Sequence, residues 1–292
     1  MMVKKHGFKS KFLTQLFTTV KPRPQILSKM KYPLERKPWS LYRKLYVSEL
    51  RIAKGLAFWQ AHAATLARAE ARYGVPANII VATIGVESKY GETVGKYCVL
   101  DALVNLAFAP EGKRRTFFRN ELEAFLLLAR EQNLSPETIL GSYAGAIGQP
   151  QFMPSSFRHY AVNFSGHTKI DLTNNVDDVI GSVANYYHQN GWEKNQPIAM
   201  PISMRGGKYQ LGLTKPKSIS LFEMLESAAL QMTVPPTRDP RFIILQTNYG
   251  NEYWHGFYNF DVIKRYNHSE LYAMAIFQLS HYLAVERERV SS

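Results

Sequence analysis

The feature that most constrains the fold is an apolar run that ends in a carboxylate. Ile79–Val86 is the longest apolar stretch of the chain, and Glu87 follows it directly. The run belongs to a predicted helix over 77–90 that is apolar on nearly every side, and such a helix has to be buried among other elements. It is far shorter than the roughly 18 residues of a membrane span. The chain must therefore fold with this helix in its core.

The positive charge of the chain is concentrated at its N-terminus. The whole sequence has 36 Lys+Arg and 23 Asp+Glu, a formal net charge of +13. Residues 1–54 hold 14 of these bases and two of the acids, a net charge of 14 − 2 = +12. The remaining residues hold 22 bases and 21 acids, a net charge of +1. The sequence therefore predicts a basic arm over 1–54, attached to a nearly neutral body.

The composition excludes several classes of protein. Apolar content of 46% and aromatic content of 13% are too high for a disordered chain. A single cysteine, Cys98, rules out an intramolecular disulfide and a cysteine-based zinc site. The first residues lack the continuous apolar segment of a signal peptide. We therefore expect either a cytoplasmic protein or an export signal upstream of this sequence.

The arm allows two compatible interpretations. Apolar residues from Phe8 to Val20 recur at helical spacing with lysines between them, and Pro22 and Pro24 predict an extended connection over 22–40. The helix could pack on the body through its Phe and Leu side chains. Its lysines could also attach the protein to a polyanion. Both interpretations stay open.

Most of the remaining pattern is helical. Helices are predicted over 48–73, 116–131, 176–190 and 270–289, the first with a buried face of Leu56, Trp59, Ala63, Leu66 and Ala69. Two β-like runs, Ile198–Ile202 and Phe242–Thr247, lie among Gly and Pro turns. The predicted fold class is predominantly α, with a smaller α+β part. We divide the chain into the arm (1–54), a helical core (55–192), the α+β part (193–265) and a C-terminal helix (266–292).

Glu87 is the candidate general acid. Positions 80, 84 and 87 share one helix face, which places the carboxylate beside Ile80 and Ile84 at the end of a buried helix. Burial and the negative end of the helix dipole should both raise the pKa of Glu87 toward the range of a general acid. The alternative is an ion pair with Lys89, Lys96 or an arginine, and periodicity alone favours that alternative.

Two further segments have the composition of binding loops. The segment 141–156 has small residues followed by Gln151, Phe152 and Met153, and it either lines a cleft or forms a tight turn against a helix. It lacks the Gly-Lys-Ser/Thr of a phosphate loop. In the segment 265–269, Asn267 or Ser269 could cap the last helix, and capping is favoured for Ser269. Tyr266, Asn267 and Tyr272 could also stack on and hydrogen-bond to sugars.

These motifs together resemble one family. Gly85-Val86-Glu87-Ser88-Lys89-Tyr90-Gly91, the 141–156 segment with Gln-Phe-Met-Pro-Ser-Ser, Asp177–Trp192 and Arg265-Tyr266-Asn267-His268-Ser269 occur in one order. The chain resembles the lytic murein transglycosylases of the MltB type, glycoside hydrolase family 103, from about residue 2 to its C-terminus. The resemblance implies a lysozyme-like catalytic core, and it favours the catalytic interpretation of Glu87 over the ion pair.

The resemblance also implies an activity and its mechanism. The family cleaves the β-1,4 bond between N-acetylmuramic acid and N-acetylglucosamine in peptidoglycan with a single glutamate, and Glu87 matches it. The glutamic acid would protonate the glycosidic oxygen, and its carboxylate would then act as base on the C6 hydroxyl, which gives a 1,6-anhydro product. Most glycosidases need a second carboxylate. Implied substrate-binding residues are Tyr42, Arg114, Ser142, Gln151, Phe152, Met153, Tyr186, Tyr266, Asn267 and Tyr272.

The sequence departs from the family in one loop. The family has a calcium loop of EF-hand type, and the matching segment here is 163–174. Calcium requires several carboxylate oxygens. Its positions Asn163, Ser165, His167 and Lys169 carry no carboxylate, and the acids that remain are Asp171 and, nearby, Asp177 or Asp178. We therefore expect no calcium, or only weak calcium binding, and no cofactor.

The remaining expectations concern partners and rival functions. The resemblance implies peptidoglycan strands as substrate, a monomer, and a periplasmic or outer-membrane-associated location, although no lipid-anchor cysteine is present near the N-terminus. The arm would contact the anionic cell wall or membrane surface. A hydrolytic muramidase and a non-catalytic peptidoglycan-binding protein are the alternatives. Nucleic-acid binding is not expected, because the chain lacks a nucleic-acid-binding motif and an interleaved basic and aromatic surface outside the arm.

Overall fold

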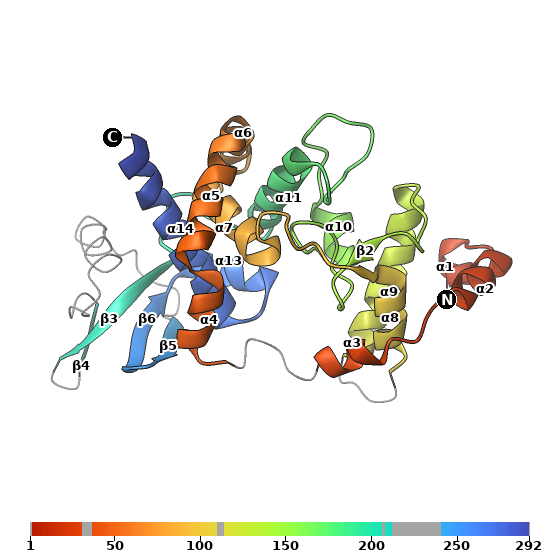
Figure 1. The fold of residues 1–292 in the computed structure, drawn as a ribbon, viewed down its shortest axis with the longest axis horizontal. Helices are drawn as coiled ribbons and strands as arrows, with labels where there is room; N and C mark the ends of the chain where they lie inside the picture. Colours follow the sequence, from red (N-terminus) through yellow and green to blue (C-terminus); the bar gives the residue numbers. More distant parts are fainter. Residues whose placement is uncertain (1, 31–36, 110–113, 206–207, 212–240, 292) are drawn as a thin grey trace. The chain divides into compact units, whose positions relative to one another are not determined.

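The computed structural model describes residues 2–30, 37–109, 114–205, 208–211 and 241–291. The described chain is predominantly helical, as predicted (Figure 1). It divides into two compact units, and two of the boundaries between them fall inside helices α7 (Ala77–Ser88) and α11 (Val176–Gln189). The first unit comprises Met1–Pro33 and Glu87–Tyr186, and the second comprises Leu34–Val86 and Tyr187–Ser292.

The four-part division by consecutive ranges stays a prediction. Residues 31–36 of the arm and 212–240 of the α+β part lie outside the described residues. No helix in the described part of the chain combines the length and the apolar character that a membrane-crossing segment needs.

The first unit is built on a pair of helices. α8 (Val99–Ala107) and α10 (Pro154–Tyr160) both pack against α9 (Arg115–Glu131). Apolar side chains of α8 and α9 fill the core, among them Leu103 and Phe125, both fully buried. The short strands β1 (Tyr97–Cys98) and β2 (Leu140–Gly141) form an antiparallel pair beside them.

Residues 2–30 of the arm form three short helices in the first unit. These are α1 (Met2–His6), α2 (Ser10–Thr18) and α3 (Pro24–Lys29). The predicted extended connection over 22–40 is wrong at its start, because Pro24 occupies the first position of α3, where proline needs no amide partner. Leu16 is 2% exposed while Phe12 and Phe17 are 41% and 37% exposed, so only part of the apolar face of α2 is buried.

Buried or paired carboxylates hold the arm to the first unit. Asp101 of α8, 4% exposed, accepts hydrogen bonds from the Lys21 amide (2.9 Å) and pairs with Arg23 (3.0 Å). Glu123 of α9 pairs with Lys5 at 2.9 Å and with His6 at 2.6 Å. The hydrogen bonds from Lys5 and His6 hold the pKa of the Glu123 carboxyl below its usual value. These contacts agree with the packing interpretation of residues 2–30, which stays a prediction for the arm as a whole.

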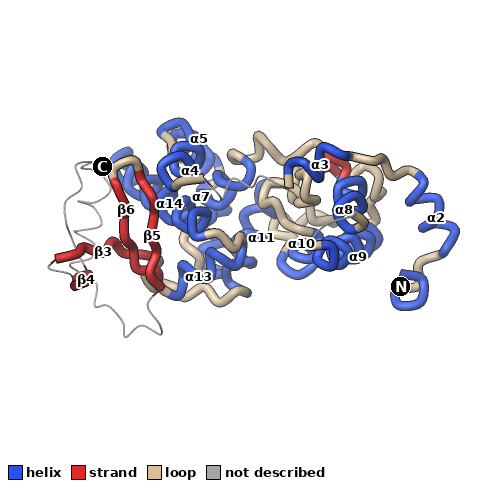
Figure 2. The backbone as a smooth tube through the Cα atoms, turned by 90° about the horizontal axis from the view of Figure 1, so that it is seen from below, coloured by secondary structure: helices blue, strands red, loops and turns tan. Residues whose placement is uncertain are grey.

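The second unit combines helices with a sheet. α4 (Trp39–Tyr46), α5 (Glu49–Ala61) and α13 (Tyr258–Tyr266) all pack against α14 (Glu270–Ser291), and α6 (Ala63–Tyr73) packs on α5. The sheet has strands β3 (Ala199–Arg205), β4 (Lys208–Leu211), β5 (Arg241–Thr247) and β6 (Gly250–Gly256) in the order β4-β3-β6-β5, all antiparallel (Figure 2). β5 and β6 form a hairpin in which Ile243 faces Trp254. The smaller α+β part of the predicted fold class is thus present, and its bounds 193–265 stay a prediction.

One predicted helix is broken in two. The structure ends α5 at Ala61 and begins α6 at Ala63, with His62 outside helical geometry (φ −118°, ψ 24°). The predicted buried face of 48–73 is therefore wrong in its first half, where Arg51, Gly55 and Phe58 are buried instead. Leu66 and Ala69 in the second half are fully buried as predicted.

Candidate active site

Glu87 lies in the last turn of α7, and it is half-buried. Its predicted neighbours along the helix, Ile80 and Ile84, are both fully buried. Thr83 is also fully buried, and its hydroxyl donates to the Ile79 carbonyl at 2.8 Å. The prediction of a buried helix that carries a carboxylate at its C-terminal end is therefore confirmed.

The backbone directly after Glu87 takes a left-handed turn. Lys89, Tyr90 and Gly91 have φ values of 55°, 62° and 90°. Left-handed backbone costs a non-glycine residue about 1–2 kcal/mol, so other contacts have to hold it. Ser88, fully buried, supplies them: its hydroxyl accepts from the Gly91 amide (3.0 Å), and its carbonyl accepts from the Thr93 amide (2.9 Å). This turn fixes where α7 ends and therefore where the Glu87 side chain begins.

The turn after Glu87 packs directly on the 141–152 segment within the first unit. A Cβ at Gly95 would lie 2.1 Å from the Gly141 carbonyl oxygen, so the two backbones touch. A Cβ at Gly91 would lie 2.9 Å from the amide carbon of Gln149. The Gln151 amide nitrogen donates to the carbonyls of Val94 (3.1 Å) and Gly148 (2.8 Å). The structure thus brings two of the predicted motifs together.

The predicted binding residues of the 141–156 segment differ in how far their side chains are buried. The Ser142 hydroxyl accepts from the amides of Ala144 (3.3 Å) and Ala146 (3.0 Å), and it keeps its own proton to donate. Met153 is half-buried just before α10. Phe152 is 1% exposed and lies 5.7 Å from the Tyr186 ring, and Tyr186 is itself 6% exposed. Phe152 and Tyr186 therefore support this segment from inside the unit.

Arg114 lies at the start of α9 and is exposed. Its guanidinium is 4.6 Å from the centre of the Phe117 ring and 5.3 Å from that of Phe118. Residues 110–113, directly before it, lie outside the described residues.

The other predicted sugar-binding residues belong to the second unit. Tyr42 of α4 is 1% exposed, between Trp39 (ring centres 6.4 Å apart) and Tyr46 (4.6 Å). Tyr266 ends α13 and stacks on Tyr272, with ring centres 6.2 Å apart.

The segment between α13 and α14 also behaves as predicted. Asn267 is half-buried directly after α13, in extended geometry. The Ser269 hydroxyl accepts from the Tyr272 amide at 3.3 Å, so the predicted cap of the last helix is confirmed.

A buried arginine in the second unit was not predicted. Arg51 is 8% exposed, and its guanidinium donates to the carbonyl of Leu45 at 3.0 Å and to the carbonyl of Gly85. These carbonyls lie in the last turns of α4 and α7, the helices that carry Tyr42 and Glu87. A cation is stabilising at a helix C-terminus because the carbonyls there carry partial negative charge. The signal in the sequence is an arginine in the same helical stripe as Gly55 and Phe58.

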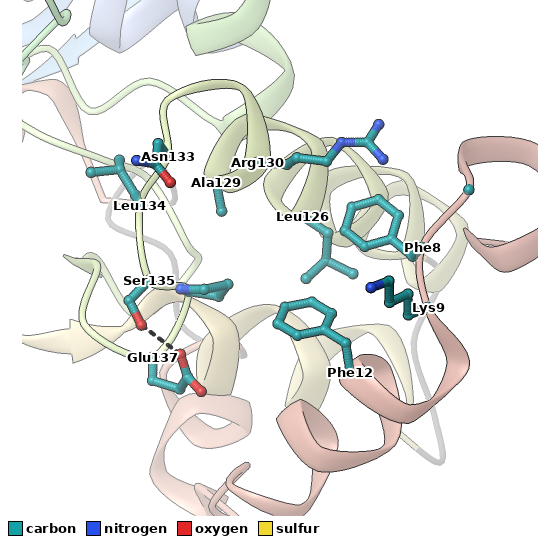
Figure 3. Close-up of a pocket in the computed structure, with 12 residues that line it drawn as sticks. Phe8, Lys9, Phe12, Leu126, Ala129, Arg130, Asn133, Leu134, Ser135 and Glu137 are labelled. Carbon is teal, nitrogen blue, oxygen red and sulfur yellow. Dashed lines mark hydrogen bonds between the residues drawn. The ribbon is translucent and has the colours of Figure 1, made fainter.

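The first unit also has a cavity away from these residues. It has a volume of about 690 Å³ and lies between the arm and the C-terminal end of α9 (Figure 3). An apolar wall is formed by Phe8, Phe12 and Leu126, and Lys9 points into the cavity. None of the predicted site residues lines this cavity.

Comparison with known proteins identifies the family. The sequence profile of the transglycosylase SLT domain matches residues 1–281. The chain belongs to this family. The match extends over nearly the whole length, so both units are part of the transglycosylase SLT domain.

Named relatives of this transglycosylase SLT chain are similar over almost all of it. Membrane-bound lytic murein transglycosylase B of Escherichia coli (strain K12) is 39% identical over 98% of this chain and 81% of its own. Soluble lytic transglycosylase SltB1 from Pseudomonas aeruginosa is 41% identical, with a TM-score of 0.83 over 98% and 97% of the two chains. Escherichia coli Slt35, solved with calcium, is 38% identical, with a TM-score of 0.83 over 98% and 91%. The lysozyme-like fold expected from the resemblance is confirmed.

The loop that matches the calcium site of the family is held by its own hydrogen bonds. Asp178, fully buried, accepts from the backbone amides of Phe164 (2.8 Å), Ser165 (2.9 Å) and Asp171 (3.0 Å). The Asn163 amide donates to the His167 carbonyl, and its oxygen accepts from the Gly166 amide (2.8 Å). The loop also carries Lys169 and His167 where calcium would need oxygen ligands, and it has few carboxylates, so the residues present do not fit a calcium ion.

Asp171 of the same loop is likewise held by hydrogen bonds from its neighbours. Burial acts to raise the pKa of the Asp171 carboxyl, but hydrogen bonds from the amides of Asn174 and Thr173 lower it below its usual value of 3.8. Among the residues that the structure describes, no three His, Cys, Asp or Glu side chains gather as a potential metal site. The absence of bound metal stays a prediction that solution measurements have to test.

Proposed function

We propose that Glu87 is the residue with which this peptidoglycan lytic transglycosylase breaks the β-1,4 bond between N-acetylmuramic acid and N-acetylglucosamine. One observation carries the proposal: in a chain of this family, the half-buried carboxyl group of Glu87 ends a buried helix. The backbone after it is fixed against the 141–152 segment. A catalytic acid has to be held in this way, because small displacements of a reacting group reduce the rate strongly.

A single carboxylate is sufficient for the reaction. Glu87 as an acid protonates the glycosidic oxygen, and the C1–O bond breaks to leave an oxocarbenium-like centre on the muramic acid. The Glu87 carboxylate then takes the proton of the C6 hydroxyl, whose oxygen bonds to C1 and forms the 1,6-anhydro ring. Acid and base roles follow each other in time, so no second carboxylate is needed. The buried acids Asp101 and Glu121 are engaged elsewhere, with the arm and with Ser155.

The predicted binding residues take different roles in this proposal. Ser142 offers its free hydroxyl proton to the sugar, and Gln151, whose amide nitrogen is engaged, offers its carbonyl oxygen. Phe152 and Tyr186 support these residues from the core. The further proposed contacts are made by Tyr42, Arg114, Met153, Tyr266, Asn267 and Tyr272.

Digestion of isolated murein sacculi tests the proposed function. Wild type should release 1,6-anhydro-muropeptides, and Glu87→Gln should lower the rate by at least about 10²-fold, since general acid–base catalysis contributes 10²–10⁴-fold. Mass spectrometry separates the rival activity, because hydrolysis adds one water, about 18 Da, to each product. Products that end in a reducing muramic acid instead of the anhydro ring would indicate a muramidase. Full activity of Glu87→Gln would show that Glu87 is not the catalyst.

We also propose that the arm holds the enzyme near its substrate in the periplasm or at the outer membrane. Its lysines Lys4, Lys5, Lys9 and Lys11 are exposed, while Lys5 also pairs with Glu123. A positive surface of this kind attracts the anionic cell wall or an anionic membrane surface. The relative in Escherichia coli is named as membrane-bound, which agrees with this location.

A further inference from the structure

Three side chains of the first unit form a cationic aromatic cluster. Lys29, the last residue of α3, donates from its ammonium group to the Tyr97 hydroxyl at 2.8 Å. The same nitrogen lies 5.1 Å from the centre of the Tyr97 ring and 5.9 Å from that of Tyr143. We call Lys29, Tyr97 and Tyr143 the Lys29 cluster.

The backbone places the Lys29 cluster beside the proposed binding residue Ser142. Tyr97 of β1 pairs with Gly141 of β2, and Ser142 and Tyr143 follow Gly141 directly. The Ser142 amide donates to the Ala146 carbonyl at 2.8 Å, which closes the turn that carries Tyr143. A ligand held at Ser142 would therefore have the Lys29 cluster next to it.

The Lys29 ammonium has capacity for a further acceptor. Lys29 is exposed, and both tyrosines are half-buried. Within the described residues Lys29 makes no ion pair, in contrast to Lys5 and Arg23, which are paired with carboxylates. An ammonium group has three N–H donors, and the Tyr97 hydroxyl uses one of them. The hydrogen bond from Lys29 also lowers the pKa of the Tyr97 hydroxyl below its usual value.

We propose that the Lys29 cluster binds a carboxylate of the peptide that branches from muramic acid, in the substrate whose sugar is bound at Ser142. The stem peptide starts at the lactyl group of the sugar, so it leaves the glycan close to the bound ring. Its free carboxylates match the ammonium donors, and its alkyl side chains match the two ring faces. This inference rests on the proposed function, because it needs the glycan to bind along the 141–152 segment.

The test compares two forms of one substrate. Glycan strands that carry stem peptides are digested in parallel with the same strands after removal of the peptides by an amidase. Lys29→Met keeps the length of the side chain and removes the charge. We expect it to raise KM about 3- to 10-fold on peptide-bearing strands, the range for one charge-assisted hydrogen bond at an exposed site. We expect kcat to be unchanged, and no effect on stripped strands.

Controls separate this inference from others. Lys194→Met removes an exposed lysine between α11 and β3, outside the arm, and it should leave KM for both substrates unchanged at fixed moderate salt. Tyr97→Phe should show a weaker form of the Lys29→Met effect. Equal losses on both substrates, or no change in KM on peptide-bearing strands, would overturn the inference.

Binding measurements keep the inference independent of the catalytic proposal. Calorimetry compares a purified anhydro-disaccharide with and without its stem peptide. Lys29→Met should reduce affinity for the peptide-bearing molecule alone, and equal affinities in wild type and Lys29→Met would overturn the inference. If Glu87→Gln retained full activity, the proposed mechanism would fail while this comparison still decided the role of Lys29.

Discussion

At the scale of single residues, close backbone contact makes Gly95 sensitive to substitution. Gly95 (φ 98°) and Gly166 (φ 82°) are both left-handed, but only at Gly95 would a Cβ meet backbone, the Gly141 carbonyl at 2.1 Å. Gly166→Ala should cost about 1–2 kcal/mol of backbone strain. Gly95→Ala should cost about 1–3 kcal/mol more, because backbone cannot make room as a side chain can. It should also lower activity, since it displaces the segment after Glu87.

The melting temperature and sacculus-clearing rate of the two alanine variants check this prediction. Gly166→Ala is the matched control, because nothing lies within 4 Å of its added Cβ. Equal effects of the two substitutions would show that the contact between Gly95 and Gly141 does not hold the turn.

Arg51 offers a second prediction at the residue scale. Arg51→Met should lower stability by about 2–4 kcal/mol, because it leaves the carbonyls of Leu45 and Gly85 without a charged donor. It should also reduce activity, since Gly85 is in the same helical turn as Glu87. Arg43→Met is the control: it breaks hydrogen bonds to Gln278 and Tyr282, both 2.9 Å, but none to α7.

Thermal unfolding and single-turnover rates distinguish these variants. At a temperature where both are folded, Arg51→Met should be slower than Arg43→Met. A rate for Arg51→Met equal to that of wild type would contradict the prediction.

Residues of this kind could not be predicted from the sequence. Arg51, Asp101 and Asp178 are all buried, but each satisfies backbone groups from a distant segment. Hydrophobic periodicity identifies apolar faces, and it treats a charged residue as exposed. Glu87 could be singled out from the sequence because it directly follows an apolar run, which a charged residue seldom does.

At the scale of elements, the long periodic helices were the most predictable. α7, α9, α11 and α14 lie within one or two residues of the predicted ranges. The break at His62 was not predicted, because the alanines on both sides are strong helix formers. β6 was not predicted either, since its stability comes from pairing with β5 and β3 rather than from its own pattern.

The 163–178 loop should not depend on calcium. Its turn is closed by hydrogen bonds from backbone amides to Asp178 and Asp171, which need no ion. We expect the melting temperature to differ by less than about 1 °C between millimolar Ca²⁺ and excess chelator, since a ligand that does not bind gives no stabilisation.

A variant gives the matching positive control for the loop. Asp178→Ala removes the acceptor of three amides and should lower the melting temperature equally in Ca²⁺ and in chelator. A rise of several degrees with Ca²⁺ in the wild type would show that the loop binds the ion.

At the scale of the whole molecule, most of the net positive charge of the chain is carried by its first 54 residues. Binding to sacculi should weaken as salt rises from about 20 to 300 mM, because screening shortens the reach of exposed charges. A variant with Lys4, Lys9 and Lys11 changed to glutamine should bind less and depend less on salt. Sedimentation of sacculi with bound enzyme measures both effects, with activity on soluble glycan strands as control. Salt-independent binding would leave the arm with a packing role alone.

The connection between α2 and α3 should resist proteolysis. It contains Lys21-Pro22-Arg23-Pro24, and Asp101 binds the Lys21 amide and the Arg23 side chain. Proteases of the trypsin type cleave after lysine and arginine, but they act poorly when proline follows. Both basic residues at this junction precede proline, and their backbone is fixed against α8 by hydrogen bonds to Asp101 and Asn105. Partial digestion should therefore cleave the chain after the exposed lysines of α1 and α2, while the peptide bonds of the junction stay intact.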